Sequence, residues 1–95
     1  MINPPGAELV MEQGPTPGVR FTLAQWPVVI GRAKPATVVI NDPYISRRHA
    51  RLSQGQEGFF IEDLNSFNGV YLNGQQITTL HPLRSGDMVG LGISI

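Results

Sequence analysis

Eleven glycines and eight prolines divide this chain of 95 residues into short apolar segments. Valine, isoleucine, threonine and phenylalanine recur in these segments, and no stripe with the 3.6-residue period of an amphipathic helix is present. β-Branched and aromatic residues between closely spaced turns favour strands over helices. The pattern therefore predicts an all-β fold, either a sandwich or a barrel.

Three turns are marked by residues with unusual backbone freedom. The segment GPTPG at 14–18 predicts a hairpin between the first two strands, because its prolines restrict φ and its glycines free it. Asn73 and Gly74 tolerate the positive φ of a two-residue type I′ turn, and a third turn is predicted at Ser85–Asp87. Between the turns we predict nine strands: Ala7–Gln13, Val19–Leu23, Val28–Arg32, Thr37–Ile40, His49–Gln54, Gly58–Asp63, Val70–Leu72, Gln76–Thr78 and Asp87–Leu91.

The composition suits one domain with a single hydrophobic core. Apolar residues make up 41% of the chain and charged residues 15%, so burial can offset the entropy of ordering. We expect one domain over residues 7–95, with MINPPG at 1–6 as the end of a linker. The run MVGLGISI at 88–95 ends inside a predicted strand, and we hypothesise that the domain is cut from a longer chain.

Charge and composition argue against several functional classes. Seven basic and seven acidic residues give a net charge of zero, unlike a general nucleic-acid binder. With no cysteine and two histidines, disulfides are ruled out, a metal site is not expected, and we expect no cofactor. No signal-like segment and no run of 18 apolar residues occurs, so we expect no membrane insertion and a cytoplasmic protein, or the cytoplasmic part of a larger one.

Three arginines and a histidine surround one serine in DPYISRRHARL at 42–52. A hydrolase could combine Ser46, His49 and Asp63, but the glycine-flanked elbow and the α/β pattern of such enzymes are missing, so we expect no enzymatic activity. Nucleic-acid binding through Ser46 to Arg51 is an alternative, because arginines neutralise phosphates. Strand alternation would divide these charges between two faces, with Arg48 on the face opposite its neighbours, which argues against this alternative.

Recognition of a single phosphate is the third hypothesis for this segment. It requires a planar guanidinium, a hydroxyl and backbone amides that converge on three oxygens. Arg32 follows a predicted strand, Ser46 and Arg47 precede another, and NSFNG at 65–69 is a polar turn. Loops at one end of a sandwich can cluster, so these residues could form one site.

Four motifs occur in an order that resembles the forkhead-associated (FHA) domain: VIGR at 29–32, SRRHARL at 46–52, EDLNSFNGVYLNG at 62–74 and LRSGDMVGLG at 83–92. The resemblance covers nearly the whole chain from Ala7. It implies a two-sheet β-sandwich of about eleven mostly antiparallel strands with binding loops at one end. It also implies a phosphothreonine-dependent protein-interaction module in serine/threonine kinase signalling, whose partner is a threonine-phosphorylated protein or peptide.

The resemblance implies a role for each matching residue. Arg32 and Ser46 would contact the phosphate, Arg47 would contribute to the phosphate or peptide contact, and Asn68 would hold the peptide backbone. The resemblance assigns structural support of the loops to Gly31, His49 and Gly69.

Phe67 departs from the family pattern, which commonly has threonine or serine before the asparagine. Phenylalanine donates no side-chain hydrogen bond to a phosphate, although it could pack against the ligand or a neighbouring domain. The same fold used for phosphorylation-independent assembly, with an apolar contact at Phe67, is therefore an alternative function.

The remaining charged and aromatic residues receive simpler interpretations. Lys34, Arg48 and Arg51 are predicted to form a solvated rim that steers an anionic partner. Four aromatic residues are predicted to lie in the core: Phe21, Trp26, Phe59 and Phe60.

Overall fold

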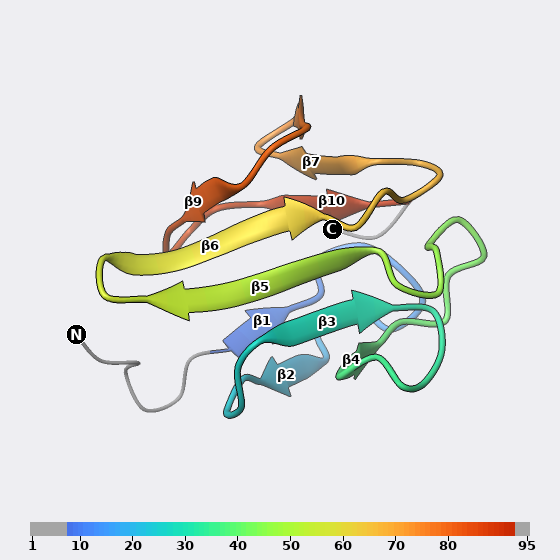
Figure 1. Ribbon diagram of the computed structural model, residues 1–95. Helices are drawn as coiled ribbons and strands as arrows, with labels where there is room; N and C mark the ends of the chain where they lie inside the picture. The colour runs from blue at the N-terminus through green and yellow to red at the C-terminus, as the bar shows by residue number, and fades with distance from the viewer. Residues whose placement is uncertain (1–7, 93–95) are drawn as a thin grey trace.

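The computed structural model describes residues 8–92, which form ten β-strands (Figure 1). No helix in this described part is long and apolar enough to cross a membrane. The strands are β1 (Glu8–Val10), β2 (Arg20–Thr22), β3 (Val28–Gly31), β4 (Val38–Val39), β5 (Ala50–Gly55), β6 (Gly58–Asp63), β7 (Val70–Leu72), β8 (Gln75–Ile77), β9 (His81–Leu83) and β10 (Val89–Leu91).

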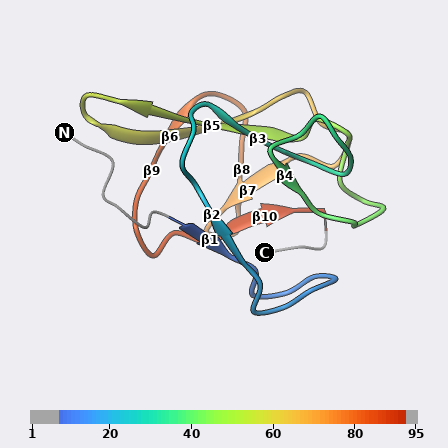
Figure 2. The same ribbon diagram turned by 90° about the horizontal axis from the view of Figure 1, so that it is seen from below.

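The strands are arranged in two layers. One layer is a five-stranded sheet with the order β4-β3-β5-β6-β9. The other contains two separate sheets, β1-β2 and β10-β7-β8, which lie on the same side of the larger sheet (Figure 2). All pairs are antiparallel except β3 with β4. The prediction of an all-β, mostly antiparallel sandwich is confirmed, with ten strands between residues 8 and 92 rather than about eleven.

The predicted turns form where local backbone chemistry indicates. β1 pairs with β2, and the hairpin between them is closed by a bond from the Gly18 amide to the Met11 carbonyl, 2.7 Å long. Asn73 and Gly74 have φ values of 51° and 86° and join β7 to β8, as a type I′ turn requires. The Asp87 amide donates to the Arg84 carbonyl across the third turn, at 3.0 Å.

The core consists of alternating residues that face one another across the two layers. Aliphatic side chains from both layers are buried, and the most fully buried are Val28, Ile45, Ala50, Leu52, Ile61 and Val70. Alternation is clear in β5, where Ala50 and Leu52 are buried while Arg51 is half-buried on the opposite face. The loop residue Ile45 extends the core toward one end of the sandwich.

Strand β9 is absent from the sequence-based prediction. It contains only three residues, the middle one Pro82, and it forms an edge of the five-stranded sheet. Proline cannot donate to a strand ladder, so it is tolerated at such an edge. Several strand bounds differ from the prediction: β5 is shifted by one residue, from His49–Gln54 to Ala50–Gly55, and β1 ends at Val10 rather than Gln13. The predicted linker at 1–6 and the strand start at Ala7 lie outside the described residues.

The aromatic residues contribute less to the core than predicted. Phe21 and Trp26 are partly buried and pack against it. Phe59 lies against Trp26, with ring centroids 5.2 Å apart. Phe60 is half-buried and does not belong to the core, because it alternates with the fully buried Ile61 and lies on the other face of β6.

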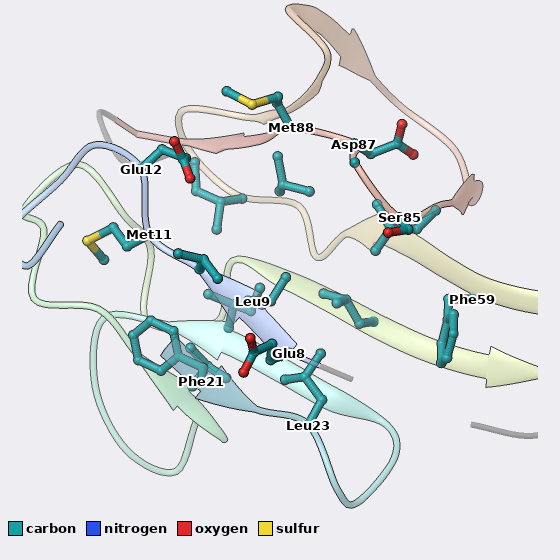
Figure 3. Close-up of a pocket in the computed structure, with 18 of the residues that line it drawn as sticks. Glu8, Leu9, Met11, Glu12, Phe21, Leu23, Phe59, Ser85, Asp87 and Met88 are labelled. Atoms are coloured by element: carbon teal, nitrogen blue, oxygen red, sulfur yellow. The ribbon is translucent and has the colours of Figure 1, made fainter. Parts of the chain in front are cut away.

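A cleft of about 580 Å³ opens between β1 and the segment that leads into β10 (Figure 3). Leu9 and Met11 line one side, and Ser85 and Met88 line the other. The gap between the two smaller sheets explains the cleft, because β1 and β10 are not hydrogen-bonded to each other.

Candidate functional site

Three loops meet at the end of the sandwich where β3 and β6 finish and β5 begins (Figure 1). They are the β3–β4 loop (residues 32–37), the β4–β5 loop (40–49) and the β6–β7 loop (64–69). The clustering follows from strand order, because β3 and β6 flank β5 and run antiparallel to it. The predicted site residues therefore lie together, on loops anchored to the five-stranded sheet.

Gly31 allows the first two loops to approach each other closely. A Cβ atom at this position would lie 1.8 Å from the Arg47 carbonyl oxygen and 2.7 Å from its carbonyl carbon. The Arg32 amide donates to the Ser46 carbonyl at 3.0 Å immediately beside this contact. Only glycine fits here without displacing the backbone of the β4–β5 loop.

His49 connects the β4–β5 loop to the β6–β7 loop. Its side chain is fully buried, its Nδ1 accepts from the Ser46 amide at 3.0 Å, and its Nε2 contacts the Gly69 carbonyl oxygen at 2.7 Å. A ring nitrogen that accepts from an amide carries no proton, so Nε2 is the donor and the ring is neutral. Gly69 has a φ of 86°, which favours glycine at this second contact point.

The hydroxyl of Ser46 is held at the junction of the same two loops. Its Oγ accepts a hydrogen bond from the Phe67 amide, 3.1 Å long. A serine hydroxyl that accepts one bond still has its own proton to donate. Ser46 can therefore donate to an anion bound beside it, with its oxygen already positioned.

Arg32 and Arg47 bring positive charge to the same place. One terminal nitrogen of the Arg32 guanidinium donates to the Ile45 carbonyl at 3.2 Å, which ties an otherwise exposed side chain to the β4–β5 loop. The remaining N–H groups of a guanidinium stay available for a ligand. Arg47 is exposed, and it makes no ion pair or side-chain hydrogen bond within residues 8–92.

Asn68 braces the loops and remains available for further bonds. Its Nδ2 donates to the Tyr44 carbonyl at 2.7 Å. Its Oδ1 and one N–H are not used by that bond, so the side chain can still engage a peptide backbone. Phe67, immediately before it, is 92% exposed.

Three residues that shape these loops were not identified in that role from the sequence. Asp42 is fully buried, and its Oδ1 accepts from the Tyr44 amide at 2.8 Å. Asp63 accepts from the Ser66 amide at 2.8 Å, and the Ser66 hydroxyl oxygen accepts from the Gly69 amide at 3.0 Å. Short polar side chains often bond backbone groups two or three residues on, and the Asp42-Pro43 pair is a typical turn start. These patterns could have indicated the turn at Asp42, and the roles of Asp63 and Ser66 in the turn predicted at 65–69.

The strand alternation predicted for Arg47 to Arg51 is wrong. β5 begins at Ala50, so Arg47 and Arg48 lie on the loop, where alternation does not apply. Arg51 does not belong to the predicted solvated rim, because two of its guanidinium nitrogens contact Glu62 Oε2 at 3.1 and 3.0 Å across the β5–β6 pair. The arginine cluster therefore loses one charge to an ion pair on the sheet.

The hydrogen bonds of Ser46 and His49 do not form a catalytic pair. Both ring nitrogens of His49 are occupied by backbone groups, and the Ser46 hydroxyl bonds the Phe67 amide instead of the imidazole. Nucleophilic catalysis requires the hydroxyl to reach a base.

Within residues 8–92, no group of three or more potential ligand side chains could hold a metal ion.

The loops of this all-β sandwich bring a guanidinium, a hydroxyl and an amide together at one end, and these groups suit the binding of an anionic ligand. The chain belongs to the FHA domain family, whose model matches residues 28–92. It is 44% identical over 84 residues to the FHA domain-containing protein FhaB of Mycobacterium tuberculosis. The matched segment covers 88% of this chain and 54% of FhaB. The chain thus spans about half the length of that relative.

Solved structures show the same fold. An FHA domain structure from a study of phosphothreonine-dependent FHA domain interactions superimposes with a TM-score of 0.81 at 30% identity, over 92% of this chain and 88% of that one. The FHA domain of a hypothetical protein from Arabidopsis thaliana superimposes with a TM-score of 0.86 at 30% identity, over 95% and 80% of the two chains. The resemblance stated from the four motifs is confirmed.

Proposed function

We propose that this domain binds threonine-phosphorylated proteins, with the phosphate held by Arg32 and Ser46. The observation that carries the proposal is the junction at Ser46, where the Phe67 amide fixes the hydroxyl oxygen and the Ile45 carbonyl tethers the Arg32 guanidinium. A phosphate monoester offers three acceptor oxygens and nearly two negative charges, which suits these donors. The solved FHA relative described as phosphothreonine-dependent supports this choice of ligand.

The local charge supports an anionic ligand although the whole chain is neutral. Lys34, Arg47 and Arg48 are exposed around the three loops and form no ion pair within the described residues. Asp42 is the acid within these loops and is fully buried, and Asp63, the last residue of β6, accepts a hydrogen bond from the Ser66 amide. The exposed ionic groups of the site are therefore basic, which would attract phosphate.

Asn68 is proposed to hold the peptide in register. Its free amide groups can bond the backbone of an extended peptide while Arg32 and Ser46 take the phosphate. Arg47 is proposed to add a second guanidinium to the phosphate or to the adjacent peptide. An unmodified threonine offers no charge to these groups, so binding should depend on phosphorylation.

The partner would therefore be the product of a serine/threonine kinase. A cytoplasmic location is part of the same proposal, because ATP-dependent threonine phosphorylation takes place inside cells. A preference for threonine over serine is implied by the family resemblance.

Paired peptides that differ only in phosphorylation of one threonine test the proposal. We expect binding of the phosphorylated peptide alone. Ser46→Ala should weaken it by about 1.5–3 kcal/mol, or roughly 10- to 150-fold in Kd, because a bond to a charged group is lost. Ser85→Ala, an exposed serine on the turn before β10, is the matched control. Equal binding of both peptides, or an unchanged Kd in Ser46→Ala, would overturn the proposal.

Phosphorylation-independent assembly is the second candidate, favoured by the 92% exposure of Phe67. In that case the phosphorylated and unmodified peptides would bind equally. Phe67→Ala would abolish this binding, whereas Ser46→Ala would not. Nucleic-acid binding gains no support, because the ion pair between Arg51 and Glu62 removes one cation from the stretch Ser46 to Arg51.

A further inference from the structure

The most exposed large apolar side chain in the described part of the chain belongs to Phe67, which lies inside the candidate site. Phe67 is 92% exposed, and Tyr44 is 55% exposed. An aromatic ring that a fold leaves in water, on a loop already implicated in binding, marks a contact surface. These two aromatic residues are the only large hydrophobic side chains classed as exposed in the β4–β5 and β6–β7 loops.

Phe67 and Tyr44 are connected by hydrogen bonds to two of the residues proposed to bind the ligand. The Phe67 amide donates to Ser46 Oγ at 3.1 Å, and the neighbouring Asn68 side chain donates to the Tyr44 carbonyl at 2.7 Å. Both aromatic residues are thus joined to the residues proposed to hold the phosphate and the peptide backbone. A peptide that bonds Ser46 and Asn68 would therefore lie close to the two residues that carry these rings.

The backbone under each ring is held firmly. The Tyr44 amide donates to Asp42 Oδ1 at 2.8 Å, and a Cβ at Gly92 would lie 2.9 Å from the Tyr44 carbonyl carbon. The β6–β7 loop is closed by the bonds at Asp63 and Ser66. A rigid aromatic residue has only two side-chain torsions to order, so it offers contact area at low entropic cost.

The side chain of Phe67 can contribute only this apolar surface to a ligand. Its amide already donates to Ser46, and its side chain has no polar atom. Its role must therefore differ from that of a threonine or serine at the same place, whose hydroxyl could reach a phosphate. An apolar ring beside an anion site discriminates between peptides by the side chains that flank the phosphate.

We propose that Phe67, together with Tyr44, selects phosphothreonine peptides that carry a large apolar or aromatic side chain close to the phosphothreonine. This inference rests on the proposed function and names the partner more narrowly. The Phe67 amide bonds Ser46 Oγ directly, and an extended peptide advances about 3.3 Å per residue, so the selected side chain lies within a few positions of the phosphothreonine. Phe67 is a specificity-determining residue, and Arg32 and Ser46 supply the dependence on phosphate.

A phosphothreonine peptide library with randomised flanking positions provides the test. Wild-type protein should enrich large apolar or aromatic residues at one flanking position, and Phe67→Ala should lose this enrichment. For the best single peptide, the substitution should raise Kd about tenfold, the effect of losing one aromatic contact of about 1.4 kcal/mol. A peptide with alanine at the selected position should bind wild type and Phe67→Ala equally, within about twofold.

Two further variants sharpen the result. Phe67→Thr should lose the apolar enrichment and bind the alanine-containing peptide more tightly than wild type, because its hydroxyl can reach the phosphate. Leu80→Ala removes another exposed apolar side chain, 53% exposed and away from the three loops, and should leave the enrichment unchanged. Near-complete exposure of Phe67 predicts that its variants melt at the temperature of the wild type.

The outcomes separate this inference from the proposed function. Phosphate-dependent binding without apolar enrichment, or with enrichment that survives in Phe67→Ala, overturns the inference alone. Equal binding of phosphorylated and unmodified libraries overturns the proposed function. If Phe67→Ala also abolished that equal binding, Phe67 would be an apolar assembly contact and the inference would fail with the proposed function.

Discussion

Gly31 lies directly against the Arg47 carbonyl, and that contact determines how the β4–β5 loop sits on the end of β3. His49 acts from the other side, because its two ring nitrogens link the Ser46 amide to the Gly69 carbonyl. Neither residue needs to touch a ligand. Both act by positioning the Ser46 hydroxyl and the Arg32 backbone.

Gly31→Ala should therefore impair both stability and binding. The new Cβ would stand 1.8 Å from the Arg47 carbonyl oxygen, so the loop must move away from β3. We expect destabilisation of roughly 1–3 kcal/mol, the usual cost of overpacking, and weaker binding of the phosphorylated peptide. Urea denaturation and peptide titration measure the two effects.

Gly55→Ala is the control for this substitution. A Cβ there would meet its nearest atom, in Phe60, at an ordinary 3.5 Å. Stability of Gly55→Ala close to that of the wild type, together with a large loss in Gly31→Ala, would support the role of the close contact. Equal stability of all three proteins would contradict it.

At the scale of elements, two turns are clamped together by Asn73 and Asp87. Asn73 Nδ2 donates to Asp87 Oδ1 at 3.0 Å, and the Met88 amide donates to Asn73 Oδ1 at 2.9 Å. Asp87 Oδ2 accepts from the Arg84 amide at 2.8 Å. The β7–β8 turn and the turn before β10 are thereby joined by side chains whose separation in sequence is 14 residues.

The hydrogen bond from Asn73, with a further one from the Arg84 amide, lowers the pKa of Asp87 below its ordinary value of 3.8. A carboxylate with a lowered pKa in the folded state adds stability above the pKa of the unfolded chain, and this contribution disappears as pH falls through the folded pKa. Asp87→Asn should thus be less stable than wild type at pH 7, and the difference should shrink below about pH 4.

Thermal melting at pH 7 and near pH 3 checks this dependence. Glu57→Gln is the control, because Glu57 is exposed and makes no hydrogen bond or ion pair within residues 8–92. A stability difference between wild type and Asp87→Asn that did not change with pH would show that the charge of Asp87 is unimportant to the clamp.

Across the whole molecule, a net charge of zero conceals an uneven distribution. Arg20 pairs with Glu8 on the first hairpin, and Arg51 pairs with Glu62 on the sheet. Lys34, Arg47 and Arg48 remain unpaired within the described residues, at the end that carries the candidate site. The domain therefore presents one basic end while its other charges largely compensate one another.

Association with a phosphorylated peptide should slow as salt rises, because the basic end steers the ligand over distances comparable to the Debye length of about 10 Å at 0.1 M. The double variant Lys34→Ala, Arg48→Ala should associate more slowly at low salt, show a weaker salt dependence and keep its dissociation rate. Stopped-flow measurements from about 20 to about 500 mM salt would show this. A dissociation rate that changed more than the association rate would place these side chains in direct contact with the peptide.

The extent of prediction from sequence differs between these scales. Asn73-Gly74 and GPTPG identify their turns correctly, because backbone torsion preferences act within a few residues. β6 and β7 have the predicted bounds for the same reason, since turn residues flank clear apolar runs. The three-residue strand β9 was missed because the sheet that stabilises it is formed by residues far away in the chain.

The sequence by itself determined the all-β class, the principal hairpins and the family, since these depend on local torsions, alternation and ordered motifs. Tertiary structure alone decided that Arg51 is neutralised by Glu62, that His49 links two loops, and that Phe67 stands exposed beside Ser46. The contacts that decide these three features join residues far apart in sequence: Arg51 and Glu62 are 11 positions apart, His49 and Gly69 are 20 apart, and Ser46 and Phe67 are 21 apart. Strand pairing and packing set such distances, and no local pattern encodes them.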